Sequence, residues 1–194
     1  MSVEESIRDR LGEGDEAPEF SLHGVDGGTH SLEDFSDNEA VLIVFTCNHC
    51  PYAKAKMPVL NSIAEDYEDV AVIGINPNDA DEYADDSFEK MKKLVEAGEI
   101  RYDAYLRDED QEVAKEYGAV CTPDPFLFKQ EKDGFRLVYH GRLDDALDPG
   151  EEPKEHHMRE AIESVLAGEP IEMDFMPSRG CSIKWKEGNE PDYW

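Results

Sequence analysis

Residues 40–57, AVLIVFTCNHCPYAKAKM, change from the pattern of a strand to that of a helix. Residues 40–46 are all apolar or β-branched. This run is too short to span a membrane and has the right length for a strand buried on both faces. Pro51 suits the first turn of a helix, and the residues after it include good helix formers. Cys47 and Cys50 therefore lie where a strand leads into a helix.

The chain is strongly acidic, with 47 Asp and Glu against 19 Lys and Arg and a formal net charge of -28. Apolar residues still make up 39%, so we expect a folded chain rather than a disordered one. The acidic residues are spread over predicted surfaces, as in residues 79–86, 108–110 and 144–155. This spread favours a protein from a salt-rich cytoplasm over one with a single acidic face for a basic partner. No basic patch is present, which argues against nucleic-acid binding.

The first residues, MSVEESIRDRLGEGDEAP, lack the apolar core of a signal peptide. No run approaches the ~18 apolar residues of a membrane helix. We therefore expect a cytoplasmic protein with no membrane partner. Four cysteines in a reducing compartment favour redox or metal chemistry over structural disulfides.

Hydrophobic periodicity predicts one domain over residues 1–194, with a polar lead-in at 1–14 and a tail without clear period at 169–194. A second apolar run at 70–76 completes a βαβ unit with parallel strands. The fold class is therefore α/β, a central mixed sheet of about five to seven strands flanked by helices. The other predicted elements are a hairpin at 18–35, a helix ending at Gly98, a weak strand at 101–106, a helix at 110–117, a hairpin at 126–140 and a helix at 153–167.

The two cysteines form a Cys-x-x-Cys motif at the start of the predicted helix. Unpaired N–H groups at a helix N-terminus stabilise a thiolate, so we expect them to lower the pKa of Cys47. Cys47 would then attack a disulfide, and Cys50 would resolve the mixed disulfide. His49, beside them, favours the thiolate form and makes the pair more oxidising.

Metal binding is the alternative interpretation of Cys47 and Cys50. A zinc ribbon needs a second close pair, whereas Cys121 and Cys181 are single and 60 residues apart. Copper(I) suits two thiolates and a nearby His, so a non-enzymatic copper(I) carrier or sensor stays open. Redox chemistry at the pair requires no cofactor and no metal.

Five segments of the chain together resemble the thioredoxin-like redoxin superfamily, and within it the peroxiredoxin-like, AhpC/TSA-related branch. The resemblance covers roughly residues 14–170 and implies a thioredoxin-like fold with an N-terminal β-hairpin and a C-terminal extension. It also implies a cis-proline facing the cysteine pair; the matching residue is Pro123, which with Thr122 would shape a groove for a substrate strand. The segments are GDEAPEFSL (14–22), VLIVFTCNHCPYAKAKMPVL (41–60), YGAVCTPDPFLF (117–128), YHGRLDD (139–145) and PSRGCSIKW (177–185).

Two departures from the family pattern affect the expected chemistry. Peroxiredoxins carry a Pro seven and a Thr three residues before their peroxidatic Cys. The corresponding residues are Ala40 and Val44 before Cys47, and Ile43 and Cys47 before Cys50. A dedicated peroxide pocket is therefore less expected than an exchange site. Thioredoxin's buried acid corresponds to Val41, so the sequence identifies no group that takes the proton from Cys50.

Two more cysteines lie outside the motif. By the same resemblance Cys121 lies near the active pair, as a third redox thiol or as a small buried hydrophobe. Cys181 lies in the tail, beside Trp185. The tail could fold back so that Cys181 forms a disulfide with Cys121; alternatively, Cys181 is a tail thiol without a role.

The sequence thus predicts a thiol–disulfide oxidoreductase whose partners are a protein or small-molecule disulfide and a thiol reductant. The alternative enzyme is a thiol-dependent peroxidase, in which peroxide oxidises Cys47 to a sulfenic acid and Cys50 condenses with it. The predicted site residues are Cys47, His49, Cys50, Thr122 and Pro123, with Cys121 and Cys181 as auxiliary redox residues.

Overall fold

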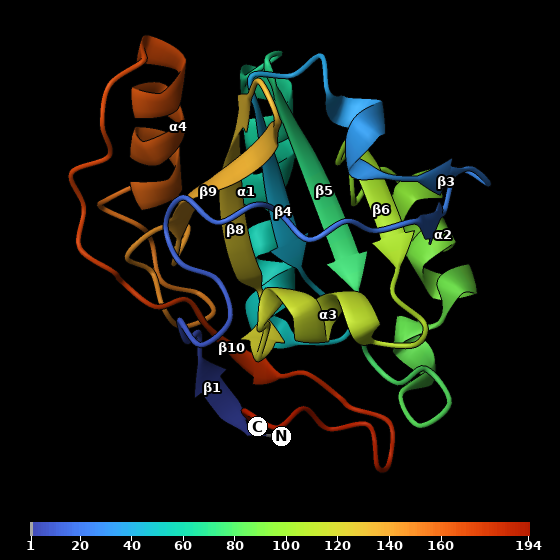
Figure 1. The fold of residues 1–194 in the computed structure, drawn as a ribbon. Coiled ribbons are helices and arrows are strands. Elements are labelled where there is room, and N and C mark those ends of the chain that lie inside the picture. Colours follow the sequence, from blue (N-terminus) through green and yellow to red (C-terminus); the bar gives the residue numbers. More distant parts are fainter. Residues whose placement is uncertain (1) are drawn as a thin grey trace.

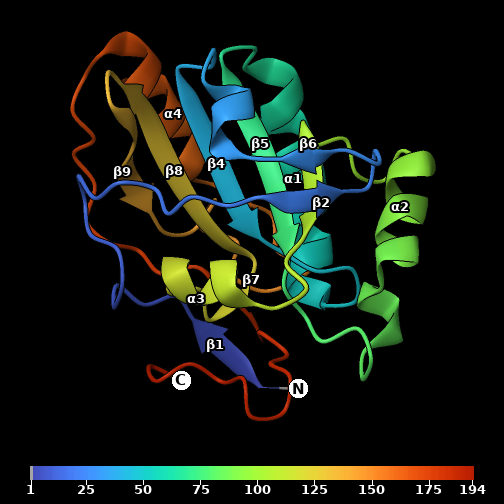
Figure 2. The same ribbon diagram turned by 45° about the vertical axis from the view of Figure 1, so that its right-hand side comes forward.

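A seven-stranded mixed sheet forms the centre of the computed structural model, which describes residues 2–194 (Figures 1 and 2). Its strand order is β3-β2-β6-β5-β4-β8-β9. The strands are β2 (Leu22–Gly24), β3 (Thr29–His30), β4 (Ala40–Phe45), β5 (Val70–Asn76), β6 (Ala104–Arg107), β8 (Asp124–Glu131) and β9 (Gly134–His140). The helices are α1 (Pro51–Asp66), α2 (Phe88–Glu96), α3 (Glu112–Tyr117) and α4 (His157–Ala167), with 3-10 turns η1 (Leu32–Phe35) and η2 (Ala84–Asp86). This arrangement confirms the predicted thioredoxin-like α/β class.

Strand β4 lies in the interior of the sheet, and every one of its residues is buried. It pairs in parallel with β5 and antiparallel with β8, which confirms the predicted βαβ unit and the mixed sheet. Successive side chains of a strand point to opposite faces, so β4 contributes to two cores. Val41, Ile43 and Phe45 pack with the N-terminal segment and α3. The alternate residues of β4 pack with α1 and α4 on the other face.

The predicted N-terminal hairpin is present but short. Strands β2 and β3 pair from Leu22↔His30 to His23↔Thr29 around a turn in which Gly27 has a φ of 90°. That backbone conformation favours glycine. Strand β2 also pairs with β6 and thus joins the hairpin to the large sheet. None of the helices among residues 2–194 has the length and apolar character needed to cross a membrane.

The C-terminal tail, for which the sequence shows no period, contains a strand. β10 (Arg179–Ser182) lies between β1 (Val3–Glu5) and β7 (Cys121–Thr122) in a second, three-stranded sheet. Figures 1 and 2 both show this small sheet at the edge of the large sheet toward which the β5 arrow points. A Cβ atom on Gly180 would lie 2.1 Å from the carbonyl oxygen of Thr122. Only glycine therefore allows β10 to approach β7 so closely.

Each of the three acidic stretches expected at the surface contains a carboxylate that is almost fully buried. Asp86, Asp108 and Asp144 have 0%, 0% and 1% of their surface exposed. Each is held by hydrogen bonds, as buried charge requires. Asp108 accepts from the backbone N–H of Ala114, and Asp144 accepts from the ammonium of Lys56. The assignment of these stretches to the surface is therefore wrong for these three residues.

Candidate active site

The cysteine pair lies at the junction of β4 and α1, as predicted. Pro51 is the first residue of α1, and Cys50 is the N-cap, with φ -66° and ψ 127°. Both Cys47 and Cys50 are 0% exposed. Because the helix begins only after Cys50, it is this residue, rather than Cys47, that meets the free N–H groups of the first turn. The backbone N–H of Ala53, in this first turn, is one of the groups that lower the pKa of Cys50.

Two neighbouring sulfurs in this site share one proton. The thiol of Cys47 donates a hydrogen bond to Cys50, and this bond, with help from Cys181 and the Ala53 N–H, lowers the pKa of Cys50 to about 5. Burial, the bond to Cys50 and the charge of Asp86 raise the pKa of Cys47. These directions favour the negative charge on Cys50 once the pair has lost one proton; while Cys50 is protonated, its thiol donates to the Thr122 carbonyl oxygen. The expected lowering of the Cys47 pKa is therefore not found, because burial, the bond to Cys50 and the charge of Asp86 all raise it.

This charge distribution predicts an unusual pH profile for the reactivity of the pair. A thiol reacts as its thiolate, and an ordinary cysteine with a pKa of about 8.5 gains reactivity through pH 8. Cys50 keeps its thiolate above about pH 5 and loses it as the pH falls through that value. We expect its alkylation by iodoacetamide to be half-maximal near pH 5 and flat above pH ~7. Mass spectrometry follows the modification, and the denatured chain is the control; a rate that still rises from pH ~8 to ~9.5 would contradict the assignment.

Thr122 and Pro123 lie against the pair, and the peptide bond between them is cis, as predicted. The Thr122 hydroxyl is 3.1 Å from the Sγ of Cys47. The Thr122 carbonyl oxygen is 3.4 Å from the Sγ of Cys50. One residue of β7 thus contacts both sulfurs and fixes their positions.

The loop between the two cysteines is held by a buried carboxylate that the sequence did not reveal. Asp86 accepts a hydrogen bond from the backbone N–H of Asn48 at 2.6 Å and from Nδ1 of His49 at 2.6 Å. The side-chain amide of Asn78 donates to the same carboxylate at 2.7 Å. The hydroxyl of Tyr105 donates to the Asn48 side chain at 2.7 Å. The loop is therefore rigid on the side facing β5 and β6.

His49 is positioned to accept a proton. Its ring is stacked on Tyr83, with centroids 5.4 Å apart and an interplanar angle of 13°. With Nδ1 bonded to Asp86, the other nitrogen, Nε2, is buried and has no hydrogen-bond partner among residues 2–194. The Sγ of Cys47, a ring nitrogen of His49 and an oxygen of Asp86 lie within 4.8 Å of one another. A thiol, an imidazole and a carboxylate are the three groups with which a base can activate a nucleophile while an acid orients the base.

Metal binding by the same three side chains fits the geometry less well. Both oxygens of Asp86 already accept hydrogen bonds from protein donors. An ion at Asp86 would displace those donors and leave buried polar groups without partners. Copper(I) would have to be held by the sulfurs and by Nε2 of His49. The donors present thus suit proton transfer better than coordination.

The remaining two cysteines point in opposite directions. In the pairing of β10 with β7, Cys181 lies opposite Thr122, and Ser182 lies opposite Cys121. Residues directly opposite share a face of the sheet, so Cys181 faces the active pair and Cys121 points away from it. Cys181 packs in one cluster with Cys47, Cys50 and Ala53, while the thiol of Cys121 lies 3.6 Å from the carbonyl oxygen of Pro123. The expected Cys121–Cys181 disulfide is not formed.

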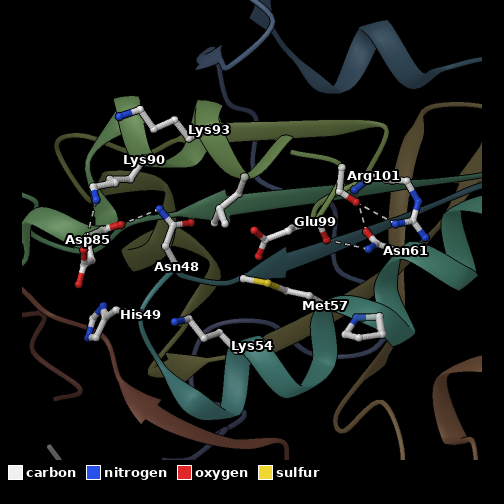
Figure 3. A pocket seen from close by; sticks show the side chains of 13 residues that line it. Asn48, His49, Lys54, Met57, Asn61, Asp85, Lys90, Lys93, Glu99 and Arg101 are labelled. Carbon is white, nitrogen blue, oxygen red and sulfur yellow. Dashed lines mark hydrogen bonds and ion pairs between the residues drawn. The ribbon is translucent and has the colours of Figure 1, made fainter. Parts of the chain in front are cut away.

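A groove of about 730 Å³ reaches the site from the side of α1 and α2 (Figure 3). Asn48 and His49 line one end of it, but neither cysteine does. In a chain of net charge -28, four basic side chains line this groove, against the two acidic residues Asp85 and Glu99. The basic residues are Lys54, Lys90, Lys93 and Arg101.

A thioredoxin-like protein has a mixed sheet with a buried dithiol at a strand-to-helix junction, and a cis-proline beside the two sulfurs. This chain has each of these features. The model of the AhpC/TSA family matches residues 13–134, more than half of the chain, and the chain belongs to this family. Thioredoxin-like protein YneN of Bacillus subtilis (strain 168) is 33% identical over 134 residues, which are 68% of this chain and 73% of YneN. The family and this relative support a redox function.

Two solved structures are similar over almost the whole chain. An uncharacterized conserved protein from Geobacillus kaustophilus is 41% identical with a TM-score of 0.88, covering 96% of this chain and 97% of that one. Hypothetical protein SMc02350 from Sinorhizobium meliloti 1021 is 37% identical with a TM-score of 0.86, covering 95% and 99%. Both likenesses extend well beyond the segment that the family model matches.

Proposed function

We propose that the protein is a thiol–disulfide oxidoreductase in which Cys47 and Cys50 cycle between a dithiol and a disulfide. The observation that carries this proposal is the buried pair of sulfurs at the start of α1, both in contact with Thr122 beside its cis peptide bond to Pro123. A thiolate attacks a disulfide, and a second thiol beside it completes the exchange. The site offers both within one loop.

In the first step the Cys50 thiolate attacks one sulfur of a substrate disulfide R–S–S–R′. The S–S bond of the substrate breaks, R′–S⁻ leaves and takes up a proton, and Cys50 is joined to R as a mixed disulfide. The sequence assigned this attack to Cys47. The position of Cys50 at the helix N-terminus supports the reverse order of roles.

In the second step Cys47 resolves the mixed disulfide. Its proton passes to Nε2 of His49, which Asp86 orients through Nδ1. The Cys47 sulfur attacks Cys50, the bond to R breaks and R–S⁻ leaves. The substrate gains two electrons, the pair becomes the Cys47–Cys50 disulfide, and a thiol reductant returns it to the dithiol. We place this cycle in the cytoplasm, where such reductants are present.

The substrate that best fits this closed site is a small-molecule disulfide. The edge of β7 at Thr122, where an extended peptide would pair, is already paired with β10. A protein substrate could use that edge only after β10 had left it. The basic side chains of the groove beside His49 suit a disulfide that carries negative charge.

The proposal is tested with the reduced protein and 5,5′-dithiobis(2-nitrobenzoate), an anionic aryl disulfide. We expect about two equivalents of aryl thiolate per chain and peptides of Cys47 and Cys50 joined in mass mapping. Cys121→Ser should behave like the unmodified protein, because Cys121 faces away from the site. Release of about one equivalent, or an oxidised protein without the Cys47–Cys50 linkage, would refute the exchange function.

Membership of the AhpC/TSA family favours a thiol peroxidase as the second candidate. In that reaction the Cys50 thiolate takes one oxygen of the peroxide and becomes a sulfenic acid, and Cys47 condenses with it, releasing water. Stopped-flow mixing with hydrogen peroxide separates the candidates. A rate constant far above that of a free thiol would establish the peroxidase, and one equal to it would exclude this candidate.

A further inference from the structure

We propose that Cys181 is a third redox thiol of this site and forms a disulfide with Cys50 in competition with Cys47. The inference rests on the exchange function proposed above and adds a second resolving residue to it. Nothing in the motif Cys-Asn-His-Cys points to Cys181, which lies more than a hundred residues further along the chain.

Cys50 has a sulfur neighbour on each side. The side chain of Cys181 is hydrogen-bonded to that of Cys50, as is the side chain of Cys47. Cys181 is 2% exposed and shares its apolar cluster with both. A disulfide bond requires two sulfurs on side chains that face one another, and Cys50 meets this condition with either partner.

The strand that carries Cys181 is held in place from several directions. Cys181 is paired with Val3 of β1 on one side and with Thr122 of β7 on the other. The hydroxyl of Ser178 donates to the carbonyl oxygen of Pro123 at 2.7 Å. The close approach of Gly180 to Thr122 brings β10 against the site. The contact between Cys181 and Cys50 is therefore built into the fold.

Strand β10 also lies where the strand of a peptide substrate would lie. A strand that pairs antiparallel with Thr122, beside the cis peptide bond to Pro123, lies where an extended peptide would add to this edge. Cys181 is the residue of β10 that faces the nucleophile. The chain thus supplies an internal segment whose sulfur lies where an incoming sulfur has to lie.

The exchange balances without an added oxidant. Once Cys50 carries R in a mixed disulfide, the Cys181 sulfur attacks Cys50, the bond to R breaks, and R leaves with the proton of Cys181 as R–SH. Burial and then the bond to Cys50 raise the pKa of Cys181 to about 12 in the reduced protein. When Cys50 enters a disulfide, its negative charge is gone. The bond to Cys50 then no longer raises the pKa of Cys181. Cys181 therefore becomes a better nucleophile at the stage where it is needed.

The test uses Cys47→Ser, which leaves Cys181 as the remaining partner beside Cys50. With the reduced variant and 5,5′-dithiobis(2-nitrobenzoate) we expect about two equivalents of aryl thiolate and a Cys50–Cys181 linkage in mass mapping. The double variant Cys47→Ser/Cys181→Ser should release about one equivalent and keep the aryl group on Cys50. Cys47→Ser/Cys121→Ser is the matched control and should behave like Cys47→Ser.

A Cys47→Ser protein that keeps the aryl group on Cys50, with no Cys50–Cys181 linkage, would overturn the proposal. Cys47→Ala repeats the measurement if the serine variant does not fold. If the exchange function itself is wrong, the unmodified protein will show no Cys47–Cys50 linkage after reaction with the aryl disulfide. The two linkages have different peptide masses, so the two failures are distinguishable.

Discussion

Cys50→Ser is expected to abolish disulfide exchange, lowering the second-order rate constant toward an aryl disulfide about 10³-fold or more. The serine hydroxyl is not ionised at neutral pH, so the helix N-terminus has no anion to stabilise. The thiol of Cys47 is then the nearest sulfur, but it is buried and its pKa is raised by burial and by the charge of Asp86. Stopped-flow absorbance of the released aryl thiolate measures the rate.

The matched variant for this prediction is Cys47→Ser. The serine hydroxyl can donate to Cys50 in place of the Cys47 thiol, so the first release of aryl thiolate should stay within about 10-fold of the unmodified protein. The two variants together assign the roles. If Cys50→Ser instead reacts rapidly and carries the aryl group on Cys47, then Cys47 is the nucleophile, as the sequence alone suggests.

The local pattern of the chain was sufficient to predict the fold class. The apolar residues from 40 to 46 are stable only in the interior, which makes this run a buried strand. The helix pattern directly after it connects this strand by a crossover to the next apolar run at 70–76, so the two strands are parallel. The cysteine pair and the cis-proline are likewise predicted from the sequence. These features depend on neighbours in sequence or on one strong resemblance.

The N-cap of this helix could have been identified from the sequence. Proline is favoured at the first position of a helix, and Pro51 therefore makes the residue before it the N-cap. That residue is Cys50. The prediction from the Cys-x-x-Cys motif placed the helix N-terminus at Cys47, three residues before the N-cap in the structure.

Asp86 and β10 could not have been found in this way. Asp85 and Asp86 are neighbours of the same type, yet the side chain of Asp85 is 74% exposed while that of Asp86 is 0% exposed. The turn η2 and the loop of Asn48 create this difference, and no local pattern encodes it. β10 is a four-residue strand whose partners are β1, near the N-terminus, and β7, about 60 residues before it, so no periodicity marks it.

The buried carboxylate gives the second large prediction. Asp86→Ala should lower the free energy of unfolding by about 3 kcal/mol, because the N–H of Asn48, the amide of Asn78 and Nδ1 of His49 all lose their acceptor in the interior. It should also slow the second release of aryl thiolate, the resolving step, about 10²-fold, since His49 is no longer oriented to take the Cys47 proton. Urea unfolding gives the first quantity and stopped-flow absorbance the second.

Asp85→Ala is the matched control, one residue away. The exposed Asp85 side chain has a 3.9 Å ion pair with Lys90, and the contact of Asp85 with Asn48 uses its backbone carbonyl, which alanine retains. We therefore expect a change in stability within about 0.5 kcal/mol and an unchanged resolving step. The first release, which depends on Cys50, should be preserved in both variants. Equal behaviour of the two variants in unfolding and in the resolving step would show that the Asp86 carboxylate neither holds the loop nor orients His49. A loss confined to unfolding would keep Asp86 as a structural residue and remove proton transfer through His49 from the mechanism.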